Sequence, residues 1–307
     1  MEHLKTLVDN WIDVSDMKWP EIIERLKKEN IDILVDLAGH SADSGIPVFY
    51  DRVARVQISG LGWMESTGLG CTDYLITDRY IDPYVSNITE KPLYLTSQFC
   101  YTGRNDVPTP KGAPCHKKGY VTFGVFNHYH KITDEMLLAW KEIMARVTDS
   151  RLLIKCQLLV SESACEMVCK RLEALGLDIS RIELEAATNT YMNRYLDVDI
   201  ALDTYPYPGG GTTCDALYMG VPVISRYGKR RGSRFGLSIL SNTGLGELAV
   251  SNINEYIERA VGLATDEELL DVLHKNLRRM MNSSPIMDGK KYMEELEKAY
   301  IDILAGK

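Results

Sequence analysis

The stretch that decides the fold is DTYPYPGGGTTCDALYMG, residues 203–220. A buried strand pattern ends here in prolines, a run of glycines follows, and a helix pattern begins directly after it. Glycines let the backbone approach a ligand closely, and the unpaired amides of a helix start attract an anion. We therefore predict that this turn binds a diphosphate. Its glycines are Gly209, Gly210 and Gly211.

Three polar side chains at the start of the predicted helix suit a nucleotide. Thr212 and Thr213 supply hydroxyl donors, and Asp215 can accept hydrogen bonds from ribose hydroxyls. The alternative is a glycine-rich turn with an acid placed near a helix start for reasons of the helix dipole alone. No GKS or GKT follows the turn, and the glycines do not form GxGxxG with a distant acid. P-loop and dinucleotide-binding proteins are therefore disfavoured.

Strand and helix patterns alternate around this turn. Strands separated by helices of about 10 to 15 residues form βαβ units, which build a parallel, doubly wound sheet. In that architecture a ligand lies at the carboxyl ends of the strands, where the glycine-rich turn falls. The predicted strands are residues 121–126, 152–156, 182–185, 200–203 and 221–225, and residues 252–304 predict three helices.

The first hundred residues carry a shorter version of the same pattern. The apolar run 31–37 is typical of a strand buried on both faces of a parallel sheet, and residues 53–58 and 74–77 repeat the strand signal. Prolines and glycines interrupt the hydrophobic pattern further on. A chain of 307 residues is long for one core, so we predict two lobes. Residues 1–104 form a partial first lobe, residues 105–119 a linker, and residues 120–307 a second lobe whose final helices pack back on the first.

Composition disfavours several classes of partner. A net charge of −8 argues against nucleic-acid binding, which needs a basic surface. No apolar run could span a membrane and no signal peptide follows Met1, so we expect a cytoplasmic protein. The seven cysteines contain no CxxC pair, and reduced thiols without zinc are expected. Asp197 and Asp199 form a DxD sequence like that of metal-dependent transferases, but we predict a structural role and no metal.

Further motifs flank the glycine-rich turn. WIDVSD, IDILVDLAGH, DYLITD and FNHYHKI precede it, and SRFGLSIL, GLGEL and SSPIMDGKKYMEELEKAY follow it. In this order they resemble the O-GlcNAc transferase and SPINDLY family of glycosyltransferases over nearly the whole chain. The resemblance implies a GT-B-like α/β fold of two doubly wound, Rossmann-like lobes, the first of them incomplete here. It also implies an inverting, metal-independent transfer of a sugar, with UDP-GlcNAc as the expected donor, to Ser or Thr hydroxyls of a protein or peptide acceptor. No cofactor is expected.

The resemblance assigns roles to residues of the second lobe. Lys131 matches a lysine that contacts the donor phosphates and stabilises the leaving diphosphate, which favours a cation where negative charge develops. The alternative for Lys131 is a solvated lysine at a helix start. His128 stands where the family has a glutamine that binds the phosphates. Three residues match positions around the base: Ala186 through its backbone, Tyr191 in place of a stacking histidine, and Arg194, which matches a family arginine.

In the first lobe, His40 matches a histidine at the carboxyl end of a strand, facing the cleft. A hydrogen-bonded turn histidine is the alternative. Leu61 and Gly62 match family residues near the sugar, whereas Met64 and Glu65 replace a Pro-Gly pair. The sugar is therefore open, and GDP-fucose is an alternative donor.

The resemblance also indicates what this chain lacks. The family's first lobe normally begins with further strands that carry a histidine, and helical repeats usually precede them. A helical-repeat segment supplied upstream is therefore an expected partner. The second hypothesis is a non-catalytic nucleotide-sugar or protein-binding module of a larger or split transferase. A dehydrogenase would bind NAD in preference to UDP, and no sequence fingerprint supports it.

Overall fold

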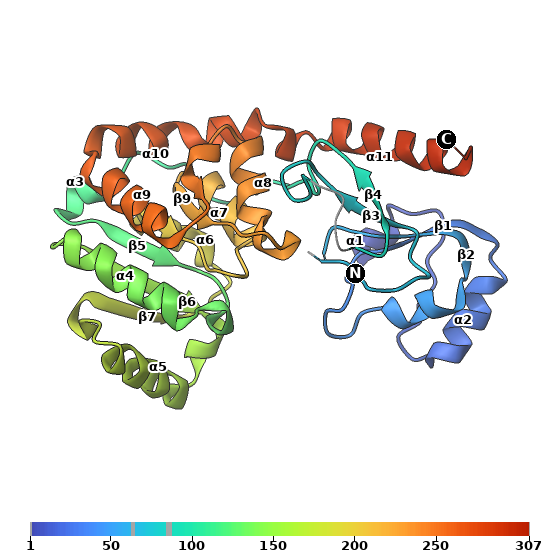
Figure 1. The fold of residues 1–307 in the computed structure, drawn as a ribbon, viewed down its shortest axis with the longest axis horizontal. Coiled ribbons are helices and arrows are strands. Elements are labelled where there is room, and N and C mark those ends of the chain that lie inside the picture. Colours follow the sequence, from blue (N-terminus) through green and yellow to red (C-terminus); the bar gives the residue numbers. More distant parts are fainter. Residues whose placement is uncertain (1, 63–64, 84–87, 307) are drawn as a thin grey trace. The chain divides into compact units, whose positions relative to one another are not determined.

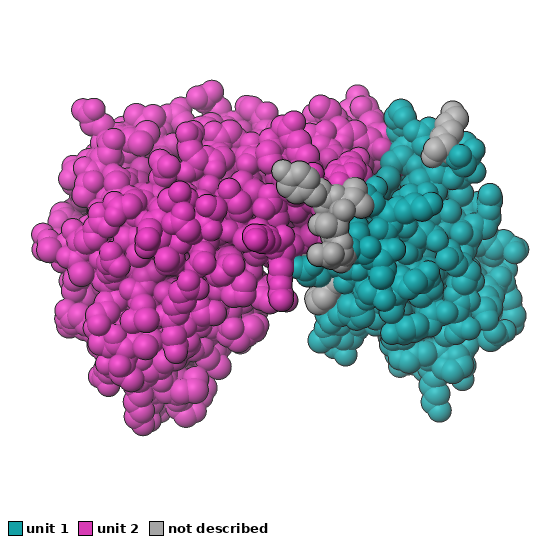
Figure 2. All heavy atoms as spheres, in the orientation of Figure 1, with its two compact units in different colours: residues 1–76, 85–93, 297–307 teal, residues 77–84, 94–296 magenta. Residues whose placement is uncertain are grey.

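The computed structural model describes residues 2–62, 65–83 and 88–306, which fold into two compact units. Unit 1 comprises residues 1–76, 85–93 and 297–307, and unit 2 comprises residues 77–84 and 94–296 (Figure 2). The proline-rich segment 105–119 falls within unit 2. Each unit is organised around one sheet.

The larger sheet has six strands in the order β10-β9-β8-β5-β6-β7 (Figure 1), and each registered pair is parallel. The predicted parallel, doubly wound α/β architecture is confirmed, because helices connect these strands. The strands are β5 (Thr122–Val125), β6 (Arg151–Cys156), β7 (Ile182–Ala186), β8 (Ile200–Leu202), β9 (Val223–Arg226) and β10 (Ala249–Val250). The helices are α3 (Cys115–Lys118), α4 (Asp134–Arg146), α5 (Glu162–Ala174), α6 (Tyr191–Arg194), α7 (Gly211–Tyr218), α8 (Phe235–Asn242), α9 (Ile253–Thr265), α10 (Glu267–Asn282) and α11 (Gly289–Leu304).

Side chains of α4 and α9 connect the core of the larger sheet to the candidate site. Thr133 caps α4 by accepting a hydrogen bond from the amide of Met136, and the helix buries Trp140. The Trp140 indole donates to the hydroxyl of Tyr256 on α9 over 3.2 Å. That hydroxyl donates in turn to the carbonyl of Asp203 over 2.9 Å. The buried side chains of α4 and α9 therefore fix the position of the carboxyl end of β8.

The smaller sheet has the order β1-β2-β3-β4, with β1 and β3 parallel to β2. Its elements are α1 (Glu2–Lys5), α2 (Trp19–Lys27), β1 (Ile31–Asp36), β2 (Ala54–Ser59), β3 (Tyr74–Thr77) and β4 (Lys91–Tyr94). The apolar run of β1 predicts a strand covered on both faces. In the structure β1 lies at a sheet edge, and Ile33, Leu34 and Val35 stay half-exposed, because β2 is its one strand neighbour among the described residues.

Two findings concern the described residues as a whole. None of their helices is both long enough and apolar enough to cross a bilayer. All seven cysteines are free thiols.

Candidate functional site

The candidate site is built around the carboxylate of Asp203, which follows β8 and is buried. Its Oδ1 accepts hydrogen bonds from the Asn127 side-chain amide (3.0 Å), the Thr204 amide (2.9 Å) and the Gly209 amide (2.7 Å). Its Oδ2 accepts from the hydroxyl of Ser225, at 2.6 Å. Burial raises the pKa of Asp203, and these donors oppose that rise. One carboxylate thus ties the ends of β5, β8 and β9 to the glycine-rich turn.

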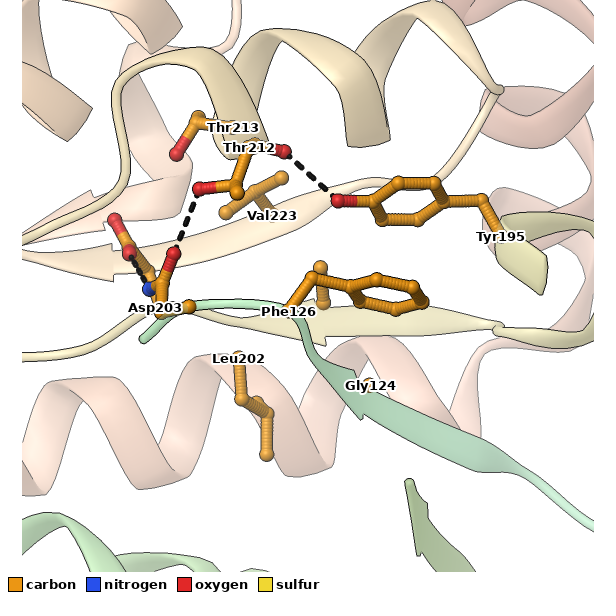
Figure 3. Close-up of a pocket in the computed structure, with 10 residues that line it drawn as sticks. Gly124, Phe126, Tyr195, Leu202, Asp203, Thr212, Thr213 and Val223 are labelled. Atoms are coloured by element: carbon orange, nitrogen blue, oxygen red, sulfur yellow. Dashed lines mark hydrogen bonds between the residues drawn. The ribbon is translucent and has the colours of Figure 1, made fainter. Parts of the chain in front are cut away.

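The two threonines at the start of α7 use their hydroxyl protons within the turn. Thr212 donates to Asn127 Oδ1 over 2.6 Å (Figure 3), and Thr213 donates to the carbonyl of Gly209 over 3.0 Å. A diphosphate at this helix start would therefore meet backbone amides rather than these hydroxyls. Asn127 is a site residue that the sequence did not single out, although it lies in the quoted motif FNHYHKI.

A small pocket lies beneath the turn, between Asp203, Asn127 and Thr212, beside the stacked rings of Phe126 and Tyr195 (Figure 3). It offers about 20 Å³, room for a single water molecule. A nucleotide cannot enter this space. A nucleotide at this turn would instead lie on the outer side of the helix start.

The outer side of the helix start is open. Gly211, the first residue of α7, is exposed, and a Cβ added to it would meet nothing within 4 Å. Gly209 differs, because an added Cβ would lie 2.6 Å from the Thr213 hydroxyl and 3.1 Å from Asn127 Oδ1. Gly210, the residue before α7, is half-buried. Packing therefore requires a glycine at position 209, whereas Gly211 faces open space.

Lys131 lies next to this turn. It ends a short 3₁₀ turn after β5, is half-buried, and its Nζ donates to the carbonyl of Pro208 over 3.3 Å. Burial lowers the pKa of Lys131, and attraction to Asp203 opposes the shift. The ring of His128 stacks on His130 with centroids 5.4 Å apart, and partial burial, followed by electrostatic interactions with His130 and Lys131, lowers the pKa of His128. A neutral His128 ring keeps one N–H donor.

Asp215 is held by two phenols. The hydroxyls of Tyr101 and Tyr191 donate to its two carboxylate oxygens, each over 2.7 Å. Burial, followed by the carboxylate, raises the pKa of both tyrosines, that of Tyr191 to about 12. Each oxygen of Asp215 retains a lone pair for a ribose hydroxyl. Tyr101 was not predicted, because no motif connects it to a residue 114 positions away.

The predicted base-side residues make contacts within the fold. The carbonyl of Ala186, at the end of β7, accepts from Lys155 Nζ over 2.6 Å. The guanidinium of Arg194 contacts three carboxylates at 2.7 to 2.8 Å. They belong to Glu183, Glu185 and Asp197. Arg194 therefore fastens α6 to β7, which is the strand that ends at Ala186.

The DxD acids are engaged in the fold as well. Besides Arg194, Asp197 contacts Lys118 Nζ at 3.3 Å. Asp199 is buried and accepts from the amides of Cys115 and Thr122, both at 2.8 Å. Among the residues that the structure describes, no group of three or more His, Cys, Asp or Glu side chains could hold a metal ion.

The predicted residues of the first lobe belong to unit 1, whereas Lys131 and the glycine-rich turn belong to unit 2. His40 is exposed, and its Nε2 donates to the carbonyl of Thr67 over 2.6 Å. Leu61 adopts a left-handed backbone conformation with φ of 63°, and the amide of Gly62 donates to the carbonyl of Gly60 over 2.8 Å. Met64 lies outside the described residues.

Residues 114–296 match the family model described as glycosyl transferase family 41. The chain is 36% identical over 296 residues to a protein of Eustoma exaltatum subsp. russellianum named as a probable UDP-N-acetylglucosamine–peptide N-acetylglucosaminyltransferase, SPINDLY, covering 94% of this chain and 32% of that protein. It is 29% identical to the Arabidopsis thaliana protein SEC, named with the same activity, covering 97% of this chain and 32% of the relative. The chain thus spans about a third of the length of these curated relatives.

Among solved structures, a mutant of the Thermobaculum terrenum O-GlcNAc transferase superposes with a TM-score of 0.91 at 32% identity, covering 99% of this chain and 58% of that chain. TarM (TM-score 0.60, 13% identity, 92% of this chain and 58% of that one) shares the fold alone. The same holds for Anabaena HepE, solved in complex with UDP (TM-score 0.60, 9% identity, 94% and 84%).

Proposed function

This chain belongs to glycosyl transferase family 41, and from that premise we propose that it carries the nucleotide-sugar-binding part of a protein O-glycosyltransferase. The proposed donor is a UDP-sugar, UDP-GlcNAc first, and the proposed acceptor is a Ser or Thr hydroxyl of a protein. The names of the relatives, which include UDP-N-acetylglucosamine and a peptide, support this choice. The proposed setting is cytoplasmic.

One observation carries the proposal: a cation and an open helix start meet at the same turn. Lys131 Nζ lies 3.3 Å from the carbonyl of Pro208, one residue before Gly209. Gly211 begins α7 with open space in front of it. A leaving diphosphate gains negative charge, and both a lysine and helix-start amides stabilise that charge without a metal ion. Asp215 would accept from the ribose.

In the proposed inverting transfer, the acceptor hydroxyl oxygen forms a bond to the anomeric carbon. The bond from that carbon to the diphosphate breaks on the opposite face, and the hydroxyl proton leaves to a base. Lys131 and the start of α7 act on the leaving group. His40, on unit 1, is the proposed residue at the acceptor side.

Incubation of a peptide library with this chain and UDP-GlcNAc, in EDTA, tests the proposal by mass spectrometry. A gain of one N-acetylhexosamine on Ser or Thr supports it, and a parallel arm with GDP-fucose tests the alternative donor. Tight binding of UDP with no transfer favours the second candidate, a donor-binding module. The specific observation favouring that module is that the chain spans 32% of the length of its relatives. The proposed partner of such a module is a helical-repeat segment. Preference for NAD over UDP, or transfer only with added manganese, contradicts both.

A further inference from the structure

Asn127 occupies an unusual place at the end of β5. It is buried, and its side-chain amide contacts two other segments of the chain. Nδ2 donates to Asp203 Oδ1 over 3.0 Å and to the Thr204 hydroxyl over 2.7 Å. Oδ1 accepts from the Thr212 hydroxyl over 2.6 Å (Figure 3). One side chain therefore joins the end of β5 to the end of β8 and to the start of α7.

The partners of this amide are not interchangeable. Asp203 as a carboxylate offers acceptors alone, so the atom facing it must carry a proton. The Thr212 hydroxyl donates its one proton to the other end of the amide, so that end must be an acceptor. An asparagine supplies both ends. An aspartate would set two carboxylates against each other, and an apolar side chain would leave buried polar atoms unpaired.

The same contacts reach the groups proposed to hold the diphosphate. Asp203 Oδ1, the atom that Asn127 contacts, also accepts from the amide of Gly209. Gly209 has no room for a side chain, because Asn127 Oδ1 and the threonine hydroxyls surround it. Lys131 follows Asn127 by four residues and contacts the carbonyl of Pro208. The buried amide of Asn127 thus contacts the residues that hold the start of α7, and Lys131 contacts the same turn.

We infer that Asn127 is a positioning residue: through Asp203 and Thr212 it sets the direction of the α7 amides and the reach of Lys131, without touching the ligand. The inference rests on the proposed function, since the ligand placed there is the diphosphate of a nucleotide. Loss of one charge-assisted hydrogen bond to a phosphate weakens binding by about ten- to a hundredfold. Removing the amide should therefore act on phosphate recognition more than on recognition of the nucleoside.

The first test measures UDP and uridine affinities by calorimetry for the unaltered chain, Asn127→Ala and the control Ser150→Ala. Ser150 is buried in unit 2, as Asn127 is, but its hydroxyl contacts the carbonyl of Val147 and the guanidinium of Arg181, which lie outside the site. We expect Asn127→Ala to weaken UDP about ten- to a hundredfold, as for the loss of one charge-assisted hydrogen bond, and uridine by less. Ser150→Ala should leave the ratio of the two affinities unchanged. Equal losses for UDP and uridine in Asn127→Ala overturn the inference.

A second variant covers the case in which Asn127→Ala does not fold. In Asn127→Asp, a protonated carboxyl can still donate to Asp203 and accept from Thr212, so the UDP-to-uridine ratio should approach the unaltered value near pH 5 and fall at pH 8. Asp203 contacts this position directly, Lys131 is attracted to Asp203, and His128 is the next residue along the chain. The phenols of Tyr195 and Tyr256 contact the backbone carbonyls of its partners Thr212 and Asp203. They are common to both proteins, so each pH point is compared with the unaltered chain. A ratio independent of pH contradicts the inference, whereas an unaltered chain that binds UDP no better than uridine overturns the proposed function itself.

Discussion

At the scale of single residues, the proposed site depends on a lysine that has lost part of its hydration. Lys131 is half-buried and donates to one peptide carbonyl, at 3.3 Å. Burial lowers its pKa because desolvation disfavours the charged form, and Asp203 recovers part of that loss. An arriving phosphate would restore the lost interaction.

Lys131→Ala should weaken UDP more than uridine, because the lost contact is to phosphate. A charge-assisted hydrogen bond is worth about 1.5 to 3 kcal/mol, or about ten- to a hundredfold in affinity. Calorimetry in EDTA measures both ligands. Lys141→Ala is a matched control, since Lys141 Nζ also donates to a backbone carbonyl, that of Leu175. Asp215→Ala should weaken both ligands alike, and equal losses in Lys131→Ala would contradict the phosphate assignment.

The affinity for UDP should also depend on pH. The protonated lysine binds phosphate, so affinity is present below the pKa of Lys131 and is lost as pH rises through it. Because burial lowers that pKa, the loss should begin below the ordinary lysine value of 10.5. Because uracil also ionises in this range, titrations from pH 7 to 10 should follow the ratio of UDP to uridine affinity. This ratio should fall in the unaltered chain and stay flat in Lys131→Ala. A flat profile in both would argue that the ammonium does not contact the ligand.

The sequence grouped residues into one candidate site where a motif named them, and it missed residues whose polar partners come from distant segments. The sequence brought Lys131 and the glycine-rich turn into one hypothesis, and they lie together in unit 2. It could not show that the Thr212 hydroxyl donates to Asn127, 85 residues earlier in the chain. The phenol of Tyr101 on Asp215 is equally invisible. Such pairings depend on which strand ends are neighbours, which no local pattern encodes.

At the scale of elements, the glycine-rich turn combines two different demands on glycine. Gly209 is buried against side chains, and Gly211 begins α7 in open space. Packing explains the first. The second has no steric reason in the fold and fits the approach of a ligand.

Gly209→Ala and Gly211→Ala should therefore differ. The methyl of Gly209→Ala meets the Thr213 hydroxyl at 2.6 Å and should cost stability, as overpacking costs about 1 to 3 kcal/mol. Gly211→Ala should change stability by less than about 0.5 kcal/mol, as typical of exposed substitutions, yet weaken UDP. Urea unfolding and calorimetry separate the two effects. Similar stability losses in both variants would mean that the turn is packed throughout.

Most elements were predictable, since buried parallel strands give continuous apolar runs. The five strands predicted for the larger sheet match β5 to β9 within two residues at either end, and the three final helices are confirmed. The sequence missed β10, which has two residues, and β4, whose four residues include a lysine and a proline and form no continuous apolar run. It also predicted full cover for β1, which the structure gives an edge position. An apolar run indicates that a strand is suited to burial, but it does not show whether other elements pack on the strand.

At the scale of the whole molecule, the two units have unequal cores. The larger cluster of buried side chains runs through unit 2 from Ala113 to Ile286. Among the described residues of unit 1, Ile22, Ile23, Val48 and Val53 form one small cluster, and the other deeply buried apolar side chains include Phe49, Ile58, Leu75 and Ile76. Buried apolar area is the main source of stability, so unit 1 should open at a lower free energy than unit 2.

Hydrogen exchange followed by mass spectrometry should therefore show two levels of protection. Amides of β1 and β2 should exchange through openings of lower free energy than those of β5, β6 and β8, because fewer packed side chains resist their opening. Adding UDP sharpens the prediction, since the proposed contacts all lie in unit 2. A ligand at 100 times its dissociation constant stabilises the state that binds it by about 2.7 kcal/mol. Protection should rise by that amount in the most stable amides of unit 2 and stay unchanged in β1 and β2. An equal rise in both units would show that the units open together, whereas a rise in β1 and β2 without one in unit 2 would contradict a UDP site in unit 2.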